Sequence, residues 1–340
     1  MSSPKDITIY DIAKELHISA ATVSRGLNDH PAIKKQTREK IHETARRMGY
    51  QQNIFASNLR KQKTNTIGVI IPHLNSYFTS TVIAGIEKVA NQSGYNLIIS
   101  QSLESVRKER SNVDTMFNSR VDGLLVSLAS DTEGFDHFEF ILQKKIPLIF
   151  FDRVVEAPNC SSITINNFQA GYSATQHLLD QRCRRIVHVA GNLRSSVYDG
   201  RHSGYKQALQ DFGLDYDSAL VLFPDLRDPD PGRTAHDILA MDTLPDGLFC
   251  VSDTQAAAIM SELRRAGVKV PQQIAVVGFN NDLLSRVVEP ALTTVYYPGQ
   301  EMGEVAARTL IRKLNQEEEH QPNNIVIEHR LIERESSLRN

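Results

Sequence analysis

The chain has 340 residues and a formal net charge of −2, and 41% of its residues are hydrophobic. This length exceeds that of a usual single domain, so two or three units with cores of their own are expected. The polar start and the lack of any run of 18 apolar residues exclude a secretory leader and a membrane span, and they predict a soluble, cytoplasmic protein.

The three cysteines, Cys160, Cys183 and Cys250, stand far apart and without paired spacing. This pattern indicates neither a disulfide framework nor a zinc cluster, so we expect all three to pack in cores. The sequence also lacks a glycine-rich phosphate loop with a lysine, a nucleophile elbow and a histidine pair at metal-ligand spacing. We therefore predict no cofactor, no metal and no enzymatic activity.

Charge is unevenly distributed along the chain. Residues 1–63 hold 12 Lys and Arg against 6 Asp and Glu, a net charge of +6. The remainder holds 26 against 34, a net charge of −8. A basic head on an acidic body is typical of a DNA-binding module fused to a sensor, although chance clustering of charge is the plainer alternative.

Residues 8–28 form a pattern of two short helices joined by a tight turn. Thr8 can cap the first helix and Ser19 the second. Within the second helix, Val23 and Leu27 are an apolar pair at the i, i+4 spacing of one buried face. This pattern predicts a helix-turn-helix.

The opposite face of the second helix carries short side chains and one arginine: Ala20, Ala21, Ser24, Arg25 and Asn28. A helix that enters the major groove of DNA needs such a face, whereas a generic helical hairpin usually carries longer solvating side chains there. Arg25 is suited to guanine, and the two alanines to thymine methyl groups. Residues 36–48 are expected to form a third helix that completes a small core.

The order of these residues is itself informative. The stretch TIYDIAKELHISAATVSRGLN at residues 8–28, followed by 37–41 and 47–50, closely resembles the lactose-repressor family of bacterial transcription regulators. The resemblance continues through residues 53–59 and, more weakly, to Arg334.

Composition alone favours a disordered connector for residues 53–65. The resemblance implies instead a hinge helix that forms on operator DNA, with Leu59 wedged between base steps of the minor groove. Together, the pattern and the resemblance predict the following DNA-binding residues: Thr8, Ser19, Ala20, Ala21, Thr22, Ser24, Arg25, Asn28, Lys34, Lys35, Thr37, Arg38, Asn53, Ala56, Leu59 and Arg60.

From residue 66 onward, continuous apolar strands alternate with helices, first over 67–152 and then again over 162–279. Such strands with helical crossovers predict parallel sheets covered on both faces. Two tandem α/β halves of similar size place a cleft between them. The fold class is therefore an all-α head and hinge followed by a two-lobed α/β core, and the resemblance implies the type I periplasmic-binding-protein fold.

In that fold the chain crosses three times between the lobes, and we place the crossings near Ile163, Thr293 and Asn324. The predicted domains are a head at 1–50, a hinge at 51–65 and a core at 66–340. Within the core, lobe 1 takes 66–162 and 294–323, and lobe 2 takes 163–293 and 324–340.

Polar residues that follow the apolar strands should point into the cleft. The predicted effector-binding residues are Tyr77, Phe78, Ser127, Asp152, Arg201, Ser252, Asp253 and Asn280. The resemblance assigns to Arg201 the grip on sugar hydroxyls or anionic groups, and to Tyr77 and Phe78 the aromatic mouth. Alternatives remain for these residues: caps for Asp152 and Asp253, a hydrophobic staple for the aromatic pair, and a surface ion pair for Arg201.

The chain departs from the family pattern at several cleft positions. Asn280 and Asn166 stand where aspartate is usual, and Tyr297 stands where glutamine is frequent. The loop 225–232 also lacks an aromatic residue often seen there. An amide in place of a carboxylate removes a charge and adds a donor, which favours an anionic ligand such as a phosphorylated sugar.

These features predict a homodimeric transcription regulator, most simply a repressor, that binds palindromic double-stranded operator DNA. A small-molecule effector, a sugar or sugar phosphate, would bind between the lobes and control operator affinity. The alternatives are a solute-binding receptor without DNA function, which the basic head disfavours, and an enzyme, which lacks a nucleophile–base pair.

Overall fold

The computed structural model describes residues 7–50, 63–224, 230–316 and 323–339. Two compact units divide the chain, Met1–Thr64 and Asn65–Asn340. No helix of the described ranges is at once long and apolar enough to cross a membrane.

The first unit is a three-helix head. It contains α1 (Ile9–Glu15), α2 (Ala20–Leu27) and α3 (Lys35–Met48). Ile12, Val23 and Ile41, one from each helix, are fully buried and form the centre of its core. The left-handed conformation of Gly49 (φ 69°) ends α3, as expected for a glycine after the last helical turn.

The second unit contains two six-stranded sheets. The first sheet has the order β11 (Asn324–Ile327), β5 (Ser161–Ile165), β4 (Leu148–Phe151), β3 (Gly123–Val126), β1 (Thr66–Ile71) and β2 (Asn96–Gln101), and all its pairs are parallel. The second has the order β12 (Arg330–Ile332), β10 (Thr293–Tyr296), β9 (Ala275–Asn280), β8 (Gly247–Cys250), β6 (Ile186–Val189) and β7 (Val221–Leu222), with only β12 antiparallel.

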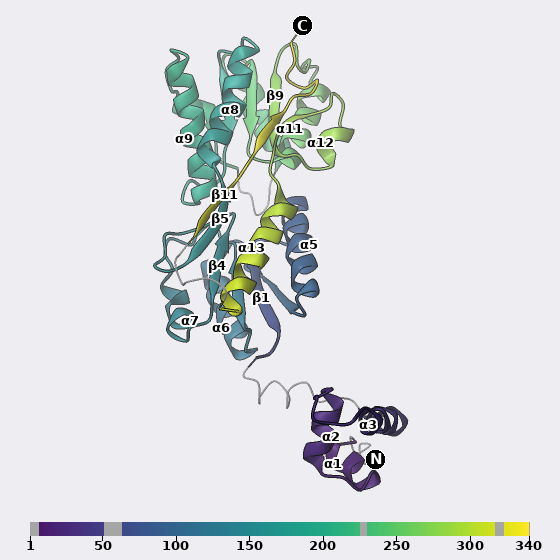
Figure 1. Ribbon diagram of the computed structural model, residues 1–340. Helices are drawn as coiled ribbons and strands as arrows, with labels where there is room; N and C mark the ends of the chain where they lie inside the picture. The colour runs from purple at the N-terminus through teal and green to yellow at the C-terminus, as the bar shows by residue number, and fades with distance from the viewer. Residues whose placement is uncertain (1–6, 51–62, 225–229, 317–322, 340) are drawn as a thin grey trace, which may run out of the picture. The chain divides into compact units, whose positions relative to one another are not determined.

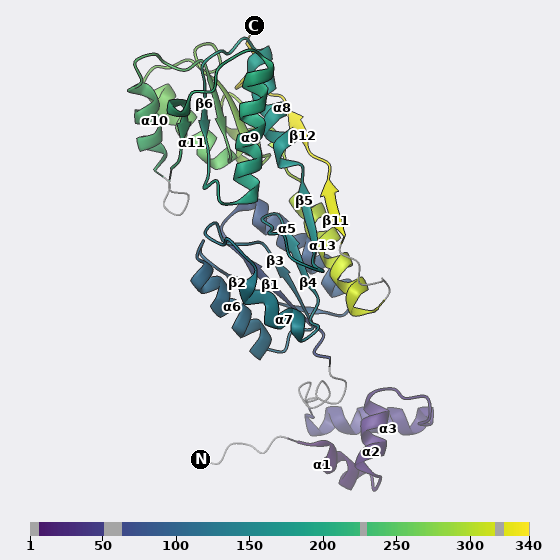
Figure 2. The same ribbon diagram turned by 90° about the vertical axis from the view of Figure 1, so that its left-hand side faces the viewer.

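Helices pack around each sheet (Figure 1, Figure 2). Around the first sheet lie α5 (Tyr77–Gln92), α6 (Val106–Asn118), η1 (Asp136–Phe138), α7 (Glu139–Gln143) and α13 (Gly299–Leu314). Around the second lie α8 (Asn167–Asp180), α9 (Ser196–Asp211), η2 (Ser218–Leu220), α10 (Pro231–Leu239), α11 (Asp253–Arg265) and α12 (Leu284–Val287). The predicted fold class is confirmed, and Cys160, Cys183 and Cys250 are buried as free thiols.

The predicted lobe limits are corrected at each crossing. β5 pairs with β4, and β11 pairs with β5, so both strands belong to the first sheet rather than to the second lobe. β10 pairs with β9 and belongs to the second sheet rather than to the first lobe. Figure 2 shows β11 and β12 as consecutive arrows, each in a different sheet. The apolar pattern of a strand does not specify its ladder partner, so hydrogen bonding across the sheets decides this point.

One strand of the second sheet is very short. The segment 219–223 contains a 3₁₀ turn, η2, and only the two-residue β7. β7 lies at the edge of its sheet, where a strand has a single neighbour to hold it.

Close helix packing positions α9, which carries Arg201. A Cβ at Gly171 of α8 would overlap the carbonyl oxygen of Arg201, and a Cβ at Gly204 of α9 would overlap the carbonyl oxygen of Phe168. The two helices therefore touch backbone to backbone, which only glycine permits at these positions. The backbone of Arg201 is held against α8 as a result.

His188 lies fully buried in β6, and only one of its ring nitrogens is bonded. Its Nδ1 bonds to the carbonyl oxygen of Phe249 at 3.1 Å, and its ring stacks on those of Phe249 and Tyr205. Burial lowers the pKa of His188 to about 3, because a charged imidazole would lose its hydration.

We expect His188 to make the protein less stable in mild acid. Between pH of about 6.5, where an exposed histidine titrates, and the folded pKa, the unfolded chain binds a proton that the folded chain does not. Stability contributed by neutral His188 is therefore full above that window and falls by roughly 1.4 kcal/mol for each pH unit within it. Urea unfolding at pH 7 and pH 5 should show a larger loss for the wild type than for His188→Phe; equal losses would contradict this assignment.

Candidate functional site

The helix α2 carries one arginine that is not engaged with the rest of the head. Ser19 accepts the backbone N–H of Thr22 at 3.1 Å and so caps the start of the helix. At the other end, the Asn28 amide donates to the carbonyl oxygen of Ser24 at 2.7 Å. Arg25 is exposed, and within the described ranges no hydrogen bond or ion pair holds its guanidinium. Arg25 is thus available to an external partner.

The two alanines of the predicted DNA-facing surface differ in exposure. Ala21 is exposed, whereas Ala20 is half-buried and packs in part against the head core. The outward face of α2 is therefore narrower than the sequence predicts, and it centres on Ala21 and Arg25.

The other predicted DNA contacts of the head lie at helix starts. Thr8 is exposed at the cap of α1, and Lys34 and Lys35 are exposed at the start of α3. Thr37 and Arg38 are half-buried, and Arg38 donates to the carbonyl oxygen of Asp29 at 3.1 Å. Four further predicted DNA contacts lie outside the described residues: Asn53, Ala56, Leu59 and Arg60. Most of the loop 225–232 of the core also lies outside them.

In the second unit, Arg201 is a buried cation held by neutral groups. Its Nε donates to the side-chain oxygen of Asn167 at 3.0 Å and its Nη1 to the carbonyl oxygen of Val251 at 3.1 Å. Its guanidinium carbon lies 3.4 Å from the ring centroid of Phe279, in cation–π contact. Burial lowers the pKa of the Arg201 guanidinium.

No carboxylate among the described residues forms an ion pair with Arg201, although Asp152 contributes favourably to its electrostatic field. The alternative of a surface ion pair is therefore wrong. A buried arginine without an anionic partner is well suited to bind an anionic or hydroxyl-rich ligand.

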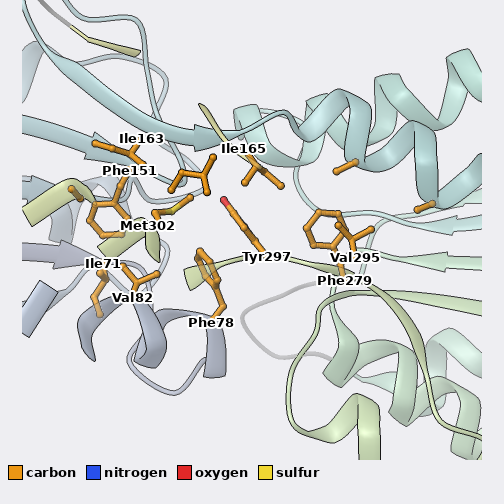
Figure 3. Close-up of a cluster of buried hydrophobic side chains, with 14 of the residues drawn as sticks. Ile71, Phe78, Val82, Phe151, Ile163, Ile165, Phe279, Val295, Tyr297 and Met302 are labelled. Carbon is orange, nitrogen blue, oxygen red and sulfur yellow. The ribbon is translucent and has the colours of Figure 1, made fainter. Parts of the chain in front are cut away.

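Asp152, Ser127 and Phe78 converge on Tyr297. The Tyr297 hydroxyl donates to one oxygen of Asp152 at 2.5 Å, and the Ser127 hydroxyl donates to the other at 3.2 Å. The rings of Phe78 and Tyr297 stack with centroids 4.2 Å apart. Figure 3 shows Tyr297 between Phe78 and Phe279, among apolar side chains of the surrounding core.

Arg153 links the two lobes beside this cluster. It pairs with Glu104 of the first lobe at 2.6 Å and donates to the hydroxyl of Tyr198 on α9 at 3.1 Å. Burial disfavours the charged form of both side chains. At Glu104 the attraction of the Arg153 cation is stronger than this effect of burial, so the pKa of the Glu104 carboxyl is lowered. Two exposed contacts also join the lobes: Asn192 to the carbonyl oxygen of Ser130 at 3.0 Å, and Arg194 to Glu133 at 2.9 Å.

The remaining predicted effector residues lie at the ends of helices and strands. Tyr77 is half exposed at the start of α5, inside the helix rather than in a staple before it. Ser252 caps α11, and Asn280, with φ 109°, ends β9. Asn166 likewise caps α8.

Asp253 departs from its predicted role as a ligand contact. It is fully buried, and its two oxygens accept the Thr294 hydroxyl at 2.6 Å and the backbone N–H of Asp282 at 2.7 Å. Burial raises the pKa of Asp253 to about 8. Because Asp253 is fully buried and accepts the backbone N–H of Asp282, it fixes the segment after β9, as the alternative of a cap predicts.

The described residues contain no group of three or more His, Cys, Asp or Glu side chains placed to hold a metal ion.

Comparisons with known proteins agree with this geometry. Residues 8–53 match the model of bacterial regulatory proteins of the lacI family, and residues 175–337 match a periplasmic binding protein-like domain. Catabolite control protein A of Priestia megaterium is 33% identical over 313 residues, covering 92% of this chain and 94% of the relative. The chain belongs to the lacI family of bacterial regulatory proteins.

Solved structures of the family share the fold. The transcriptional regulator CelR in complex with cellobiose is 26% identical, with a TM-score of 0.73, and covers 97% of this chain and 99% of its own. The lac repressor dimer bound to operator and the anti-inducer ONPF is 22% identical, with a TM-score of 0.86, and covers 98% and 100%. As a member of the family, the chain is a DNA-binding transcriptional regulator with an effector-binding core, and it is not an enzyme.

Sequence reasoning missed several residues that join the lobes. Arg153 directly follows the predicted cleft residue Asp152 and could have been found at that strand end, but its partners Glu104 and Tyr198 lie far away in sequence. Tyr297 was noted only as a departure from the family pattern, because no sequence signal shows which side chain a crossing segment contacts.

We expect Arg153→Met to destabilise the protein by about 3–5 kcal/mol, because it leaves the buried Glu104 carboxylate without its cation. Adding Glu104→Gln should recover most of that loss. The matched control is Arg194→Met, which removes an exposed ion pair and should cost less than about 1 kcal/mol. Urea unfolding measures the free energy of unfolding of all three variants. Equal losses of stability for Arg153→Met and Arg194→Met would refute the buried ion pair.

Proposed function

We propose that this protein is a homodimeric repressor that binds palindromic operator DNA through two heads. A small metabolite of the sugar or sugar phosphate class, bound between the core lobes, controls its operator affinity. The observation that carries this proposal is the presence of two arginines suited to external partners. Arg25 is unengaged on a short-chained helix face, and Arg201 is buried with no ion-pair partner among the described residues.

Base selection is assigned to α2. Arg25 has the length and donors for guanine, while Ala21, and Ala20 in part, offer only apolar contact. Lys34 and Lys35 are exposed and suited to phosphates, which carry affinity without sequence information. One head therefore reads few bases, so selectivity requires two heads on two half-sites and the hinge with Leu59.

The metabolite class rests on the core. Asp152 and Ser127 suit hydroxyl groups, Phe78 and Phe279 supply aromatic walls, and Arg201 suits a negative charge. The solved complex of CelR with cellobiose supports a sugar-like ligand. Because no carboxylate in the described part of the chain forms an ion pair with Arg201, an anionic sugar derivative is favoured over a neutral one.

A direct test selects an operator from a random duplex library with the full chain and then measures its binding against salt. A palindromic consensus and a steep fall of affinity with salt are expected. Thermal unfolding in the presence of glucose, cellobiose and glucose 6-phosphate then tests the ligand class. Failure to enrich any sequence would overturn the proposal, and so would an affinity that salt does not change.

We expect Arg25→Ala to remove most of the discrimination between the selected operator and scrambled DNA, while weak non-specific binding remains. A bidentate base contact is worth about 1–3 kcal/mol, so the ratio of the two affinities should fall roughly tenfold or more for each head. Arg46→Ala on α3, which removes another exposed arginine of the head, is the matched control and should leave the ratio unchanged. An unaltered ratio for Arg25→Ala would exclude it from base readout.

The dimer is assigned to the core because a head of this size buries too little surface to associate stably. Exposed apolar side chains provide the surface: Leu283 and Val287 at α12 are 60% and 69% exposed, and Tyr77 at α5 is 50% exposed. Figure 1 shows α5 and α12 on the same side of their unit. Because two heads are needed for two half-sites, a second copy of this chain must associate with the first, and we assign the contact to this surface.

We expect Val287→Asp to weaken self-association and, with it, operator binding, because the charge would be buried between copies. Val326→Asp makes the same change at a valine of similar exposure, 61%, on β11 and should leave the dimer intact. Sedimentation equilibrium of the full chain at micromolar concentration measures both. A monomeric wild type, or equal association of the two variants, would contradict this dimer surface.

A further inference from the structure

Tyr297 is a buried residue in a connecting segment of the chain. It lies between β10 of the second sheet and α13, which packs against the first, so it belongs to a segment that crosses between the lobes. Although it is in a connection, its side chain is 96% buried, since only 4% of its surface is exposed. A crossing segment thus delivers a large side chain into the space between the two sheets.

The contacts of Tyr297 come from both lobes. From the first lobe, Phe78 stacks on its ring at 4.2 Å with an interplanar angle of 19°, and Asp152 accepts its hydroxyl at 2.5 Å. From the second lobe, Phe279 meets its ring edge-on at 5.9 Å, and the Arg201 guanidinium carbon lies 5.6 Å from its centroid. Figure 3 shows this arrangement, with the phenol oxygen pointing away from Phe279.

These partners are also the groups assigned above to an effector. A ring stacked on Phe78 and a hydroxyl bound to Asp152 are what a hydroxylated cyclic ligand would supply. Tyr297 makes both interactions with its own side chain. Its burial joins the apolar side chains of the two sheets into one continuous cluster, which includes Phe78, Tyr297 and Phe279.

We propose that Tyr297 is an internal ligand of the effector site: it holds the two lobes together and is the residue that an incoming effector must displace. This inference rests on the proposed function only for the identity of the site as an effector site. Displacement costs the effector the stacking of Tyr297 and its bond to Asp152, so the side chain sets which ligands can enter. A ligand that only replaces these two contacts gains little binding free energy, because it makes no interaction that Tyr297 does not already make. A ligand that also bonds to Arg201 adds a charge-assisted hydrogen bond.

The test removes this side chain and returns it as a free molecule. Tyr297→Gly leaves a cavity of the shape of p-cresol, which is the tyrosine side chain itself. We expect the variant to unfold at a lower temperature, and saturating p-cresol to raise that temperature by about 5 °C while leaving the wild type unchanged. Toluene has no hydroxyl for Asp152 and should give a smaller rise.

Tyr297→Phe serves if the glycine variant does not fold, because it keeps the ring and removes only the hydroxyl. Hydrogen exchange should then quicken on both sides of the lobe contact, in residues 127–153 and 196–201, without a change in the head. Equal p-cresol effects on wild type and variant, no effect on either, or unchanged exchange in Tyr297→Phe would overturn the proposal.

Operator binding, measured in parallel, separates this inference from the proposed function. If p-cresol rescues Tyr297→Gly but the wild type binds no operator, the internal ligand stands and the regulatory function fails. If the wild type binds its operator but p-cresol rescues nothing, the function stands and the role of Tyr297 is wrong.

Discussion

The hydrogen bond between the Tyr297 hydroxyl and the Asp152 carboxylate joins the two lobes at their centre. Removing a carboxylate even partly from water is unfavourable unless donors replace that water, and at the part-buried Asp152 a crossing segment brings one donor while Ser127 brings another. The same phenol packs between Phe78 and Phe279, so one side chain satisfies a polar group and closes an apolar gap. Arg201 and Arg153 both lie in the field of the Asp152 carboxylate, which favours their charged forms.

The two arginines beside this bond have opposite environments. Arg153 has a carboxylate partner in Glu104, which makes it a structural bridge whose loss exposes an unpaired buried charge. Among the residues that the structure describes, the hydrogen-bond acceptors of Arg201 are neutral and its guanidinium lies on the face of Phe279, so an anion would stabilise it. Its position depends on α8 and α9 meeting at glycines, since any larger residue there would move the backbone that carries it.

The head follows a different physical logic. Its core of Ile12, Val23 and Ile41 is its own, and Ser19 and Asn28 bond to the backbone at the two ends of α2. Arg25 is the long side chain of α2, and no described residue of the head holds its guanidinium. A small, self-contained core that presents an unengaged arginine on a short-chained helix face is suited to enter a groove as a unit, and the lacI family to which the chain belongs uses this kind of head on DNA.

The sequence by itself determined the class of each part. Helical spacing and caps in residues 8–48 specify the head, and continuous apolar strands specify two α/β lobes, because both signals are local and periodic. Tertiary structure alone decided which sheet receives β5, β10 and β11, since a ladder is chosen by hydrogen-bond partners distant in sequence. It also decided that Asp253 is buried and bonds to residues of its own lobe, that Glu104 and Tyr198 contact Arg153, and that Tyr297 stacks on Phe78. Such contacts join residues up to 219 positions apart, and no local pattern encodes them.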